Sequence, residues 1–209
     1  FGPSHVSLYQ LTIEPDTVFE KLYAAGRLQV PDPEMAADMF ELTQEMTAAA
    51  GLPAYEVSNH ARAGQQSRHN LVYWRYGEYV GVGPGAHGRI VADGERMATE
   101  NERHPETWAK RVEIEGQGIT ATEHVSRQAA ADEMLLMGLR LQEGLDLSRL
   151  AVVGGVAISP VVVSRLVKQG VLELSVDGCK LRAIGPGRIL INELVLQVSE
   201  SFVPHQPPA

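Results

Sequence analysis

The sequence predicts an α/β fold in its first part, followed by a small winged-helix-like α+β module. Two apolar runs at residues 5–13 and 54–58 enclose a long helical pattern at residues 33–50. A strand, a helix and a second strand in this order usually form a βαβ unit with parallel strands. After about residue 120, several short helical patterns and a β-hairpin signal follow one another, and this succession is typical of a winged helix.

The run at residues 5–13 alternates in a way that predicts a strand. Gln10 and Thr12 lie on one face near its C-terminal end. Because the carboxyl ends of parallel strands carry the chemistry in α/β folds, we expect both side chains to face a site. The alternative is a half-exposed edge strand. A turn at residues 14–17 then leads into a short helix that ends at Gly26.

The long helix at residues 33–50 has a clear start signal. Asp32 can cap its N-terminus, and Pro33 suits the first helical position. Four apolar side chains follow at three- or four-residue spacing and share one face: Met35, Met39, Leu42 and Met46. A face of this kind usually packs in the core, and we expect it to do so here.

Residues 67–88 combine side chains that suit neither an ordinary surface loop nor an ordinary aliphatic strand. They hold two histidines, three tyrosines, one tryptophan and five glycines. Tyrosine and tryptophan offer flat apolar faces, imidazole can transfer a proton or bind a metal, and glycine lets a backbone come close to a bulky group. This combination suits a wall for a large planar ligand. The alternative is an aromatic core beside a tight glycine turn.

The rest of the chain is expected to form a hairpin at Asp93-Gly94, a helix at residues 104–114 and a polar linker at residues 120–126. The C-terminal module is expected to hold three helices, a hairpin around Asp177-Gly178 and a closing helix, over residues 127–141, 144–150, 156–169, 171–183 and 184–199. We therefore expect three parts: a first domain at residues 1–119, a second at 120–200 and a disordered tail at 201–209.

Composition argues against several classes of function. The net charge of −8 disfavours nucleic-acid binding, and the helix in the recognition position has only Arg165 and Lys168 as basic groups. The single cysteine, Cys179, excludes an internal disulfide or an all-cysteine cluster within these residues, and it fits a reducing, cytoplasmic compartment. No apolar run is long enough to span a bilayer. We expect neither a nucleic-acid partner nor a transmembrane segment.

Four runs together resemble one family. They read Ser-Leu-Tyr-Gln-Leu-Thr-Ile-Glu-Pro at residues 7–15, Tyr-Glu-Val-Ser-Asn at 55–59, Arg-His-Asn-Leu-Val-Tyr-Trp at 68–74 and Gly-Val-Gly-Pro-Gly-Ala-His at 81–87. These runs are similar to the C-terminal half of the oxygen-independent coproporphyrinogen III oxidase-like radical-SAM proteins. The motif His-Asn-x-x-Tyr-Trp at residues 69–74 resembles the HemW-type haem chaperones, the branch that this motif separates from the true oxidases.

The resemblance implies that the first domain is the C-terminal half of a partial (β/α) radical-SAM barrel. In the family, a Cys-x-x-x-Cys-x-x-Cys loop in the N-terminal half binds a [4Fe-4S] cluster and S-adenosylmethionine. This loop is absent here. We therefore expect the chain to be a fragment that needs the missing N-terminal half and has no catalytic residue of its own.

Two functions stay open on the basis of this resemblance. The first is a chaperone that binds haem and delivers it to a haem-acceptor protein. The second is an oxidase that acts on coproporphyrinogen III in porphyrin biosynthesis. A non-catalytic structural fragment is a third interpretation. The motif at residues 69–74 favours the chaperone, whose implied ligand is haem or a porphyrin.

The resemblance also implies cofactor-binding residues, which are Gln10, Thr12, Arg68, His69, Tyr73, Trp74 and His87. It ranks His69 first as a ligand of haem iron and His87 second. Arg68 is expected to pair with a haem propionate, and the rings of Tyr73 and Trp74 to line the porphyrin face. Gln10 and Thr12 are expected to face the S-adenosylmethionine and substrate side of the barrel.

Overall fold

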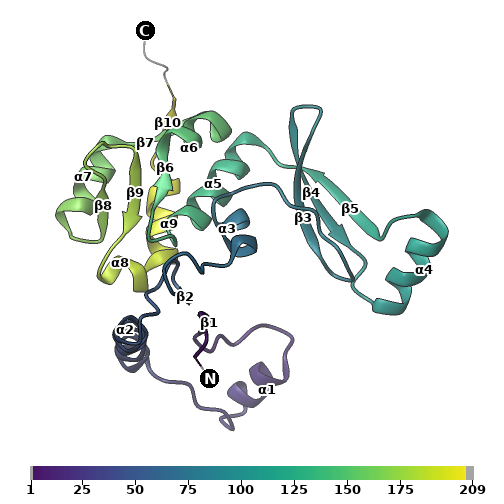
Figure 1. Cartoon of the computed structure of the whole chain (residues 1–209), viewed down its shortest axis with the longest axis horizontal. Coiled ribbons are helices and arrows are strands. Elements are labelled where there is room, and N and C mark those ends of the chain that lie inside the picture. The colour runs from purple at the N-terminus through teal and green to yellow at the C-terminus, as the bar shows by residue number, and fades with distance from the viewer. Residues whose placement is uncertain (1, 206–209) are drawn as a thin grey trace. The chain divides into compact units, whose positions relative to one another are not determined.

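The computed structural model describes residues 2–205 of the chain (Figure 1). The chain divides into two compact units, which we call the N-terminal unit (Phe1–Ser67) and the C-terminal unit (Arg68–Ala209). Of the tail predicted at residues 201–209, residues 206–209 lie outside the described part. Within residues 2–205, no helix has the length and apolar content needed to cross a membrane.

The N-terminal unit contains two short strands and two helices in the order β1, α1, α2 and β2: His5–Ser7, Val18–Ala24, Pro33–Ala49 and Asn59–Ala61. Both helices begin where the sequence predicts. The Thr17 hydroxyl accepts a hydrogen bond from the Glu20 N–H, and a carboxylate oxygen of Asp32 accepts one from the Met35 N–H at 2.9 Å. These caps satisfy N–H groups that have no partner within the helix.

The strands β1 and β2 pair antiparallel, so the predicted parallel βαβ unit is wrong. Ser7 lies opposite Asn59 in this pair. The cause is a tight reversal at residues 54–58, across which Ala54 bridges His60 in antiparallel fashion. The chain thus turns back before β2 begins, and the segment predicted as a strand is the turn itself. Likewise, only His5–Ser7 of the strand predicted at residues 5–13 is extended and paired.

The apolar face of α2 is exposed in the N-terminal unit, so its predicted burial is wrong. Its four side chains keep between 53% and 64% of their surface accessible: Met35, Met39, Leu42 and Met46. None of the residues of α2 is buried. The physical reason is size, because two paired strands of three residues each cannot cover a helix of 17 residues.

The C-terminal unit begins with helix α3 (Arg68–Trp74), after which an antiparallel sheet follows. The sheet has the strand order β3-β4-β5 and carries α4 between its last two strands: β3 is His87–Ala92, β4 Glu95–Asn101, α4 Pro105–Glu115 and β5 Ile119–His124 (Figure 1). The predicted hairpin is confirmed. Asp93 and Gly94 join β3 to β4 with φ of 52° and 81°, as the twist of such a turn requires.

Strand β5 occupies most of the segment predicted as a polar linker, so the linker at residues 120–126 is wrong. Its backbone pairs with β4, for example Thr122 with Thr99. A polar edge strand of this kind lacks the apolar run that sequence patterns depend on. The predicted domain boundary between residues 119 and 120 stays a prediction, although β5 pairs with β4 across it.

The predicted succession of three helices, a hairpin and a closing helix in the C-terminal module is confirmed. In chain order the elements are α5 (Arg127–Gly138), β6 (Leu145–Asp146), α6 (Leu147–Gly154), β7 (Val156–Ile158), α7 (Pro160–Lys168), β8 (Leu172–Leu174), β9 (Lys180–Ala183), α8 (Pro186–Ile189), α9 (Ile191–Ser199) and β10 (Phe202–Pro204). The strands β6, β9 and β8 form one antiparallel sheet, and β10 pairs with β7. Because Phe202–Pro204 is a paired strand, the prediction of disorder is wrong for these residues.

The core of the C-terminal unit lies in this module. Its largest fully buried apolar side chains come from several helices and strands: Leu135, Leu139, Leu145, Leu150, Leu166, Leu172, Leu181 and Val198. Gly138 allows α5 to approach β6, since a Cβ atom there would lie 2.7 Å from Cδ1 of Leu145. The module is therefore closely packed, as protein interiors are in general.

Candidate functional site

Four rings gather on and beside α3, and we call them the aromatic cluster: His69, Tyr73, Trp74 and Tyr79. His69 and Tyr73 are one helical turn apart, with ring centroids 5.8 Å apart in an edge-on arrangement. The Tyr73 ring also lies 4.9 Å from that of Trp74 and 6.4 Å from that of Tyr79. Tyr73 is thus the centre of the cluster.

The turn after α3 brings Tyr79 back to the helix. Tyr76 adopts a left-handed φ of 55°, and the Gly77 N–H donates to the carbonyl of Val72 at 2.7 Å. A Cβ atom at Gly77 would lie 2.8 Å from that same carbonyl oxygen, so only glycine fits here. The reversal directs the following segment past the aromatic side chains.

The two ends of the cluster differ in exposure. His69 and its neighbour Arg68 are exposed at the start of α3, whereas Trp74 is half-buried at its end. The guanidinium of Arg140, in the turn after α5, lies 4.7 Å from the Trp74 ring centroid, a cation–π contact that holds the indole in place. The cluster therefore presents an accessible imidazole beside a fixed aromatic surface.

The glycine-rich segment before β3 packs against its own chain. A Cβ atom at Gly81 would lie 2.6 Å from the carbonyl oxygen of His87, and one at Gly88 would lie 2.5 Å from Oγ1 of Thr99. The Asn101 side-chain amide donates to the carbonyls of Gly81 and Gly83 at 3.1 and 2.9 Å. Gly81 therefore serves a tight turn, as the alternative interpretation of the sequence had it, and Gly88 lets β3 lie close to the Thr99 side chain of β4.

The structure groups some of the predicted site residues and separates others. His69, Tyr73 and Trp74 share the aromatic cluster, and Arg68 is on the same helix. His87 is the exposed first residue of β3. Two backbone hydrogen bonds between Tyr79 and Arg89, of 2.8 and 2.9 Å, tie the start of that strand to the cluster.

Gln10 and Thr12 belong to the N-terminal unit. Both are exposed, and they follow β1 instead of lying on it. The Gln10 amide donates a hydrogen bond of 3.1 Å to the carbonyl of Ala36 in α2. Their proposed orientation toward a cofactor stays a prediction.

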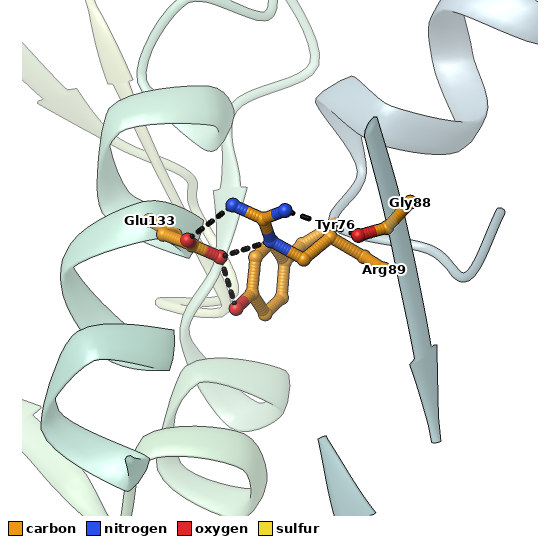
Figure 2. A network of polar contacts seen from close by, with 4 residues as sticks. All are labelled: Tyr76, Gly88, Arg89 and Glu133. Atoms are coloured by element: carbon orange, nitrogen blue, oxygen red, sulfur yellow. Dashed lines mark hydrogen bonds and ion pairs between the residues drawn. The ribbon is translucent and has the colours of Figure 1, made fainter. Parts of the chain in front are cut away.

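A polar network that the sequence does not predict joins the turn after α3 to β3 and α5 (Figure 2). One carboxylate oxygen of Glu133 accepts hydrogen bonds from the Tyr76 hydroxyl at 2.7 Å and from Nε of Arg89 at 3.2 Å. The other oxygen accepts from Nη2 of Arg89 at 2.9 Å. Arg89 and Tyr76 are 44 and 57 positions away from Glu133 in the sequence, so no local pattern reveals the network.

The network fixes the charge of its members. Burial and the hydrogen bond to Glu133 raise the pKa of the Tyr76 phenol, which therefore stays a protonated donor. Burial acts to raise the pKa of Glu133, but the hydrogen bonds from Arg89 and Tyr76 outweigh it and leave this pKa lowered from its ordinary value of 4.5. The hydrogen bond to Glu133 in turn raises the pKa of Arg89. Near neutral pH, a carboxylate thus faces a guanidinium and a neutral phenol.

Residues 2–205 contain no group of three or more His, Cys, Asp or Glu side chains that could hold a metal ion. A metal that brings its own ring of ligands, as haem iron does, needs only one or two protein ligands. An exposed imidazole beside aromatic faces fits such a group, and His69 meets this description.

Comparison with known proteins gives the class of this chain. A family model described as HemN C-terminal domain matches residues 125–183. The chain is 34% identical over 194 residues to the protein named Heme chaperone HemW of Mycobacterium tuberculosis, a match that covers 93% of this chain and 47% of that protein. It is also 42% identical over 145 residues to the mitochondrial Radical S-adenosyl methionine domain-containing protein 1 of Bos taurus, covering 68% of this chain and 33% of that protein.

A solved structure agrees with these relatives. The coproporphyrinogen III oxidase HemN of Escherichia coli, described as a radical SAM enzyme, matches with a TM-score of 0.64 over 94% of this chain and 48% of that chain. At 15% identity this likeness shows the fold, and it confirms the predicted fold class despite the antiparallel pairing of β1 and β2.

By their printed names, these matches define the class that the chain resembles, the radical-SAM proteins. Within this class, residues 125–183 match the HemN C-terminal domain, and the chain as a whole is similar in sequence to HemW and in fold to HemN. The chain spans a third to a half of the length of the curated relatives that it matches.

Proposed function

We propose that the intact protein binds haem at the aromatic cluster and delivers it to an acceptor protein. The observation that carries this proposal is the exposed imidazole of His69 beside the rings of Tyr73 and Trp74 on one helix. Several of the relatives bear the name heme chaperone, which supports the same interpretation.

Each member of the cluster has a chemical role in this proposal. His69 supplies the axial nitrogen for the iron, with His87 as the second candidate. Tyr73 and Trp74 offer apolar faces for the porphyrin, and Arg68 pairs with a propionate. Because His69 is exposed, haem held in this way can be passed on to another protein.

The family also implies S-adenosylmethionine and a [4Fe-4S] cluster. This chain has a single cysteine, so its own residues do not fit a cluster held by cysteine thiolates. We propose that the N-terminal half of the family's barrel supplies these ligands and packs on the apolar face of α2. Gln10 and Thr12, exposed beside that helix, would face the S-adenosylmethionine and substrate side.

A haem titration of the intact protein, followed by its Soret band, tests the proposal. We expect His69→Ala to weaken binding by about tenfold or more, as the loss of an axial ligand should. His104→Ala is the matched control, since His104 is an exposed histidine of the same unit that pairs with Glu106. Unchanged affinity in His69→Ala removes this residue from the site, and loss only in His87→Ala reverses the ranking.

The oxidase alternative makes a different prediction. Under anaerobic conditions with S-adenosylmethionine and a reductant, an oxidase consumes coproporphyrinogen III, whereas a haem chaperone leaves it unchanged. The similarity to HemN concerns the fold, so substrate turnover by the intact protein is the measurement that separates the two functions.

The cytoplasm is the compartment that we propose for the protein. The single cysteine, Cys179, is exposed and free, as suits a reducing environment. Fractionation of cells with an antibody against the chain tests this location.

A further inference from the structure

Glu133 has an unusual position, because one carboxylate connects three elements of the C-terminal unit. It projects from α5, while its two partners come from the turn after α3 and from β3 (Figure 2). Tyr76 is only 4% exposed, and the side chains of Arg89 and Glu133 are 23% and 29% exposed. An ion pair that water reaches so little is weakened less by salt than a surface pair.

The network closes a circuit with the aromatic cluster. From Glu133 the circuit runs through Arg89, whose backbone pairs with that of Tyr79. The Tyr79 ring contacts that of Tyr73 on α3. Three residues after Tyr73, the Tyr76 hydroxyl returns to Glu133. Glu133 therefore provides a second connection between the α3 region and β3, besides the backbone pairing of Tyr79 with Arg89.

The circuit also includes the two candidate iron ligands. His69 contacts Tyr73 and so belongs to the α3 side. His87 lies two residues before Arg89 on β3, and side chains two apart on a strand point to the same face. A shift of Arg89 would therefore be passed on to the end of the strand that carries His87.

Removal of the Glu133 carboxylate would leave its partners unsatisfied. The Tyr76 hydroxyl and the Arg89 guanidinium would both lose an acceptor in a largely buried position, which favours their movement toward water. In addition, the Arg96 guanidinium lies 4.2 Å from the Tyr76 ring centroid, so two cations would remain with no carboxylate between them. Both effects would weaken the connection between α3 and β3.

We propose that Glu133 is a positioning residue for haem binding, which holds the aromatic cluster and the start of β3 in one arrangement. This inference rests on the proposed function and deepens it. Glu133 acts through its hydrogen-bond partners Tyr76 and Arg89.

The test compares haem titrations of the intact protein with Glu133→Ala and Glu133→Gln, below the unfolding temperature of each variant. We expect Glu133→Ala to weaken haem binding about tenfold and to move the Soret band, as the loss of an outer partner of a ligand does. Glu133→Gln keeps an acceptor for the Tyr76 hydroxyl, so its haem affinity should lie between those of the wild type and Glu133→Ala. The control is Glu173→Ala, which breaks an Arg–Glu pair in the β8–β9 hairpin and should bind haem as the wild type does.

A merely structural role gives another result. Glu133→Ala would then lower the unfolding temperature while the affinity and the Soret band of the folded protein stay unchanged, and this outcome overturns the inference. If Glu133→Ala does not fold, Tyr76→Phe decides, because it removes one hydrogen bond and keeps the ion pair. A shifted Soret band in Tyr76→Phe supports the inference, and a wild-type band and affinity refute it.

The experiments distinguish a failure of the proposed haem site from a failure of the positioning role of Glu133. If His69→Ala weakens haem binding and the Glu133 variants do not, the positioning role is wrong and the proposed haem site remains. If His69→Ala and His87→Ala both bind haem normally, the proposed site is wrong, and the positioning role is wrong with it.

Discussion

The two units of the chain differ in how they use their apolar side chains. In the N-terminal unit, neither α1 nor α2 contains a buried residue, although α2 has a regular apolar face. In the C-terminal unit, the apolar faces of α5, α6 and α9 are buried against one another and against short strands. The helical periodicity is present in both units. It shows which face of a helix is apolar, but it does not show whether the covering partner lies in the same segment.

The largest difference between the units should appear in the free energy of unfolding when one leucine of each unit is replaced by alanine. Leu150→Ala removes a fully buried side chain and should lower the free energy of unfolding by about 3 kcal/mol. Leu42→Ala removes a side chain that is 54% exposed on α2 and should cost about 0.5 kcal/mol or less. Urea unfolding of the chain, followed by circular dichroism, measures both. Equal losses would contradict the difference between the units.

The next effect concerns acid stability of the C-terminal unit. The folded-state pKa of Glu133 is lowered from 4.5, so its contribution is complete above pH 4.5 and is lost as the pH falls through the lower, folded value. Glu133→Gln should remove about 1.5 kcal/mol at pH 7, the usual value of a hydrogen bond to a charged group, and less at pH 2 to 3. Urea unfolding at both pH values measures this. A loss that does not depend on pH would contradict an ionised Glu133.

A somewhat smaller effect is expected at the helix caps. Asp32→Ala removes the cap of α2 and should cost about 1 kcal/mol. Since α2 is not packed in a core, we expect the loss to appear as faster hydrogen exchange in its first turn only. Ser126→Ala removes the matching cap of α5, whose helix is packed. This change should lower the unfolding midpoint of the whole C-terminal unit. A lowered unfolding midpoint in Asp32→Ala, together with a purely local effect in Ser126→Ala, would contradict the comparison.

The smallest effect should come from an exposed ion pair. Glu173→Ala breaks the ion pair with Arg182. The side chains of Glu173 and Arg182 keep 46% and 42% of their surface accessible. Such pairs contribute about 0.5 kcal/mol or less. A thermal unfolding curve close to that of the wild type is expected. A loss as large as that of Leu150→Ala would contradict the small contribution expected of an exposed ion pair.

Local signals in the sequence predicted the parts of the fold that local interactions decide. The cap at Asp32, the turn at Asp93-Gly94 and the order of elements in the C-terminal module are all present. The direction of β2 was predicted wrongly, because a turn within five residues reversed the chain before the strand began. β5 was missed, because it is held by backbone pairing and carries few apolar side chains.

The candidate site shows the same limit. The motif at residues 69–74 pointed to His69, Tyr73 and Trp74, which are neighbours on one short helix. Glu133 and Arg89 were not predicted, since they meet only after the chain has folded. Long-range polar contacts leave no periodic pattern, and the structure is needed to find them.

The nature of the axial ligand tests the central claim most directly. Magnetic circular dichroism of the ferric haem complex of the intact protein reports which side chain binds the iron. The account predicts an imidazole-ligated spectrum in the wild type, in His87→Ala and in the control His104→Ala, and the loss of this spectrum in His69→Ala. An unchanged imidazole spectrum in His69→Ala would contradict the claim that α3 carries the haem ligand.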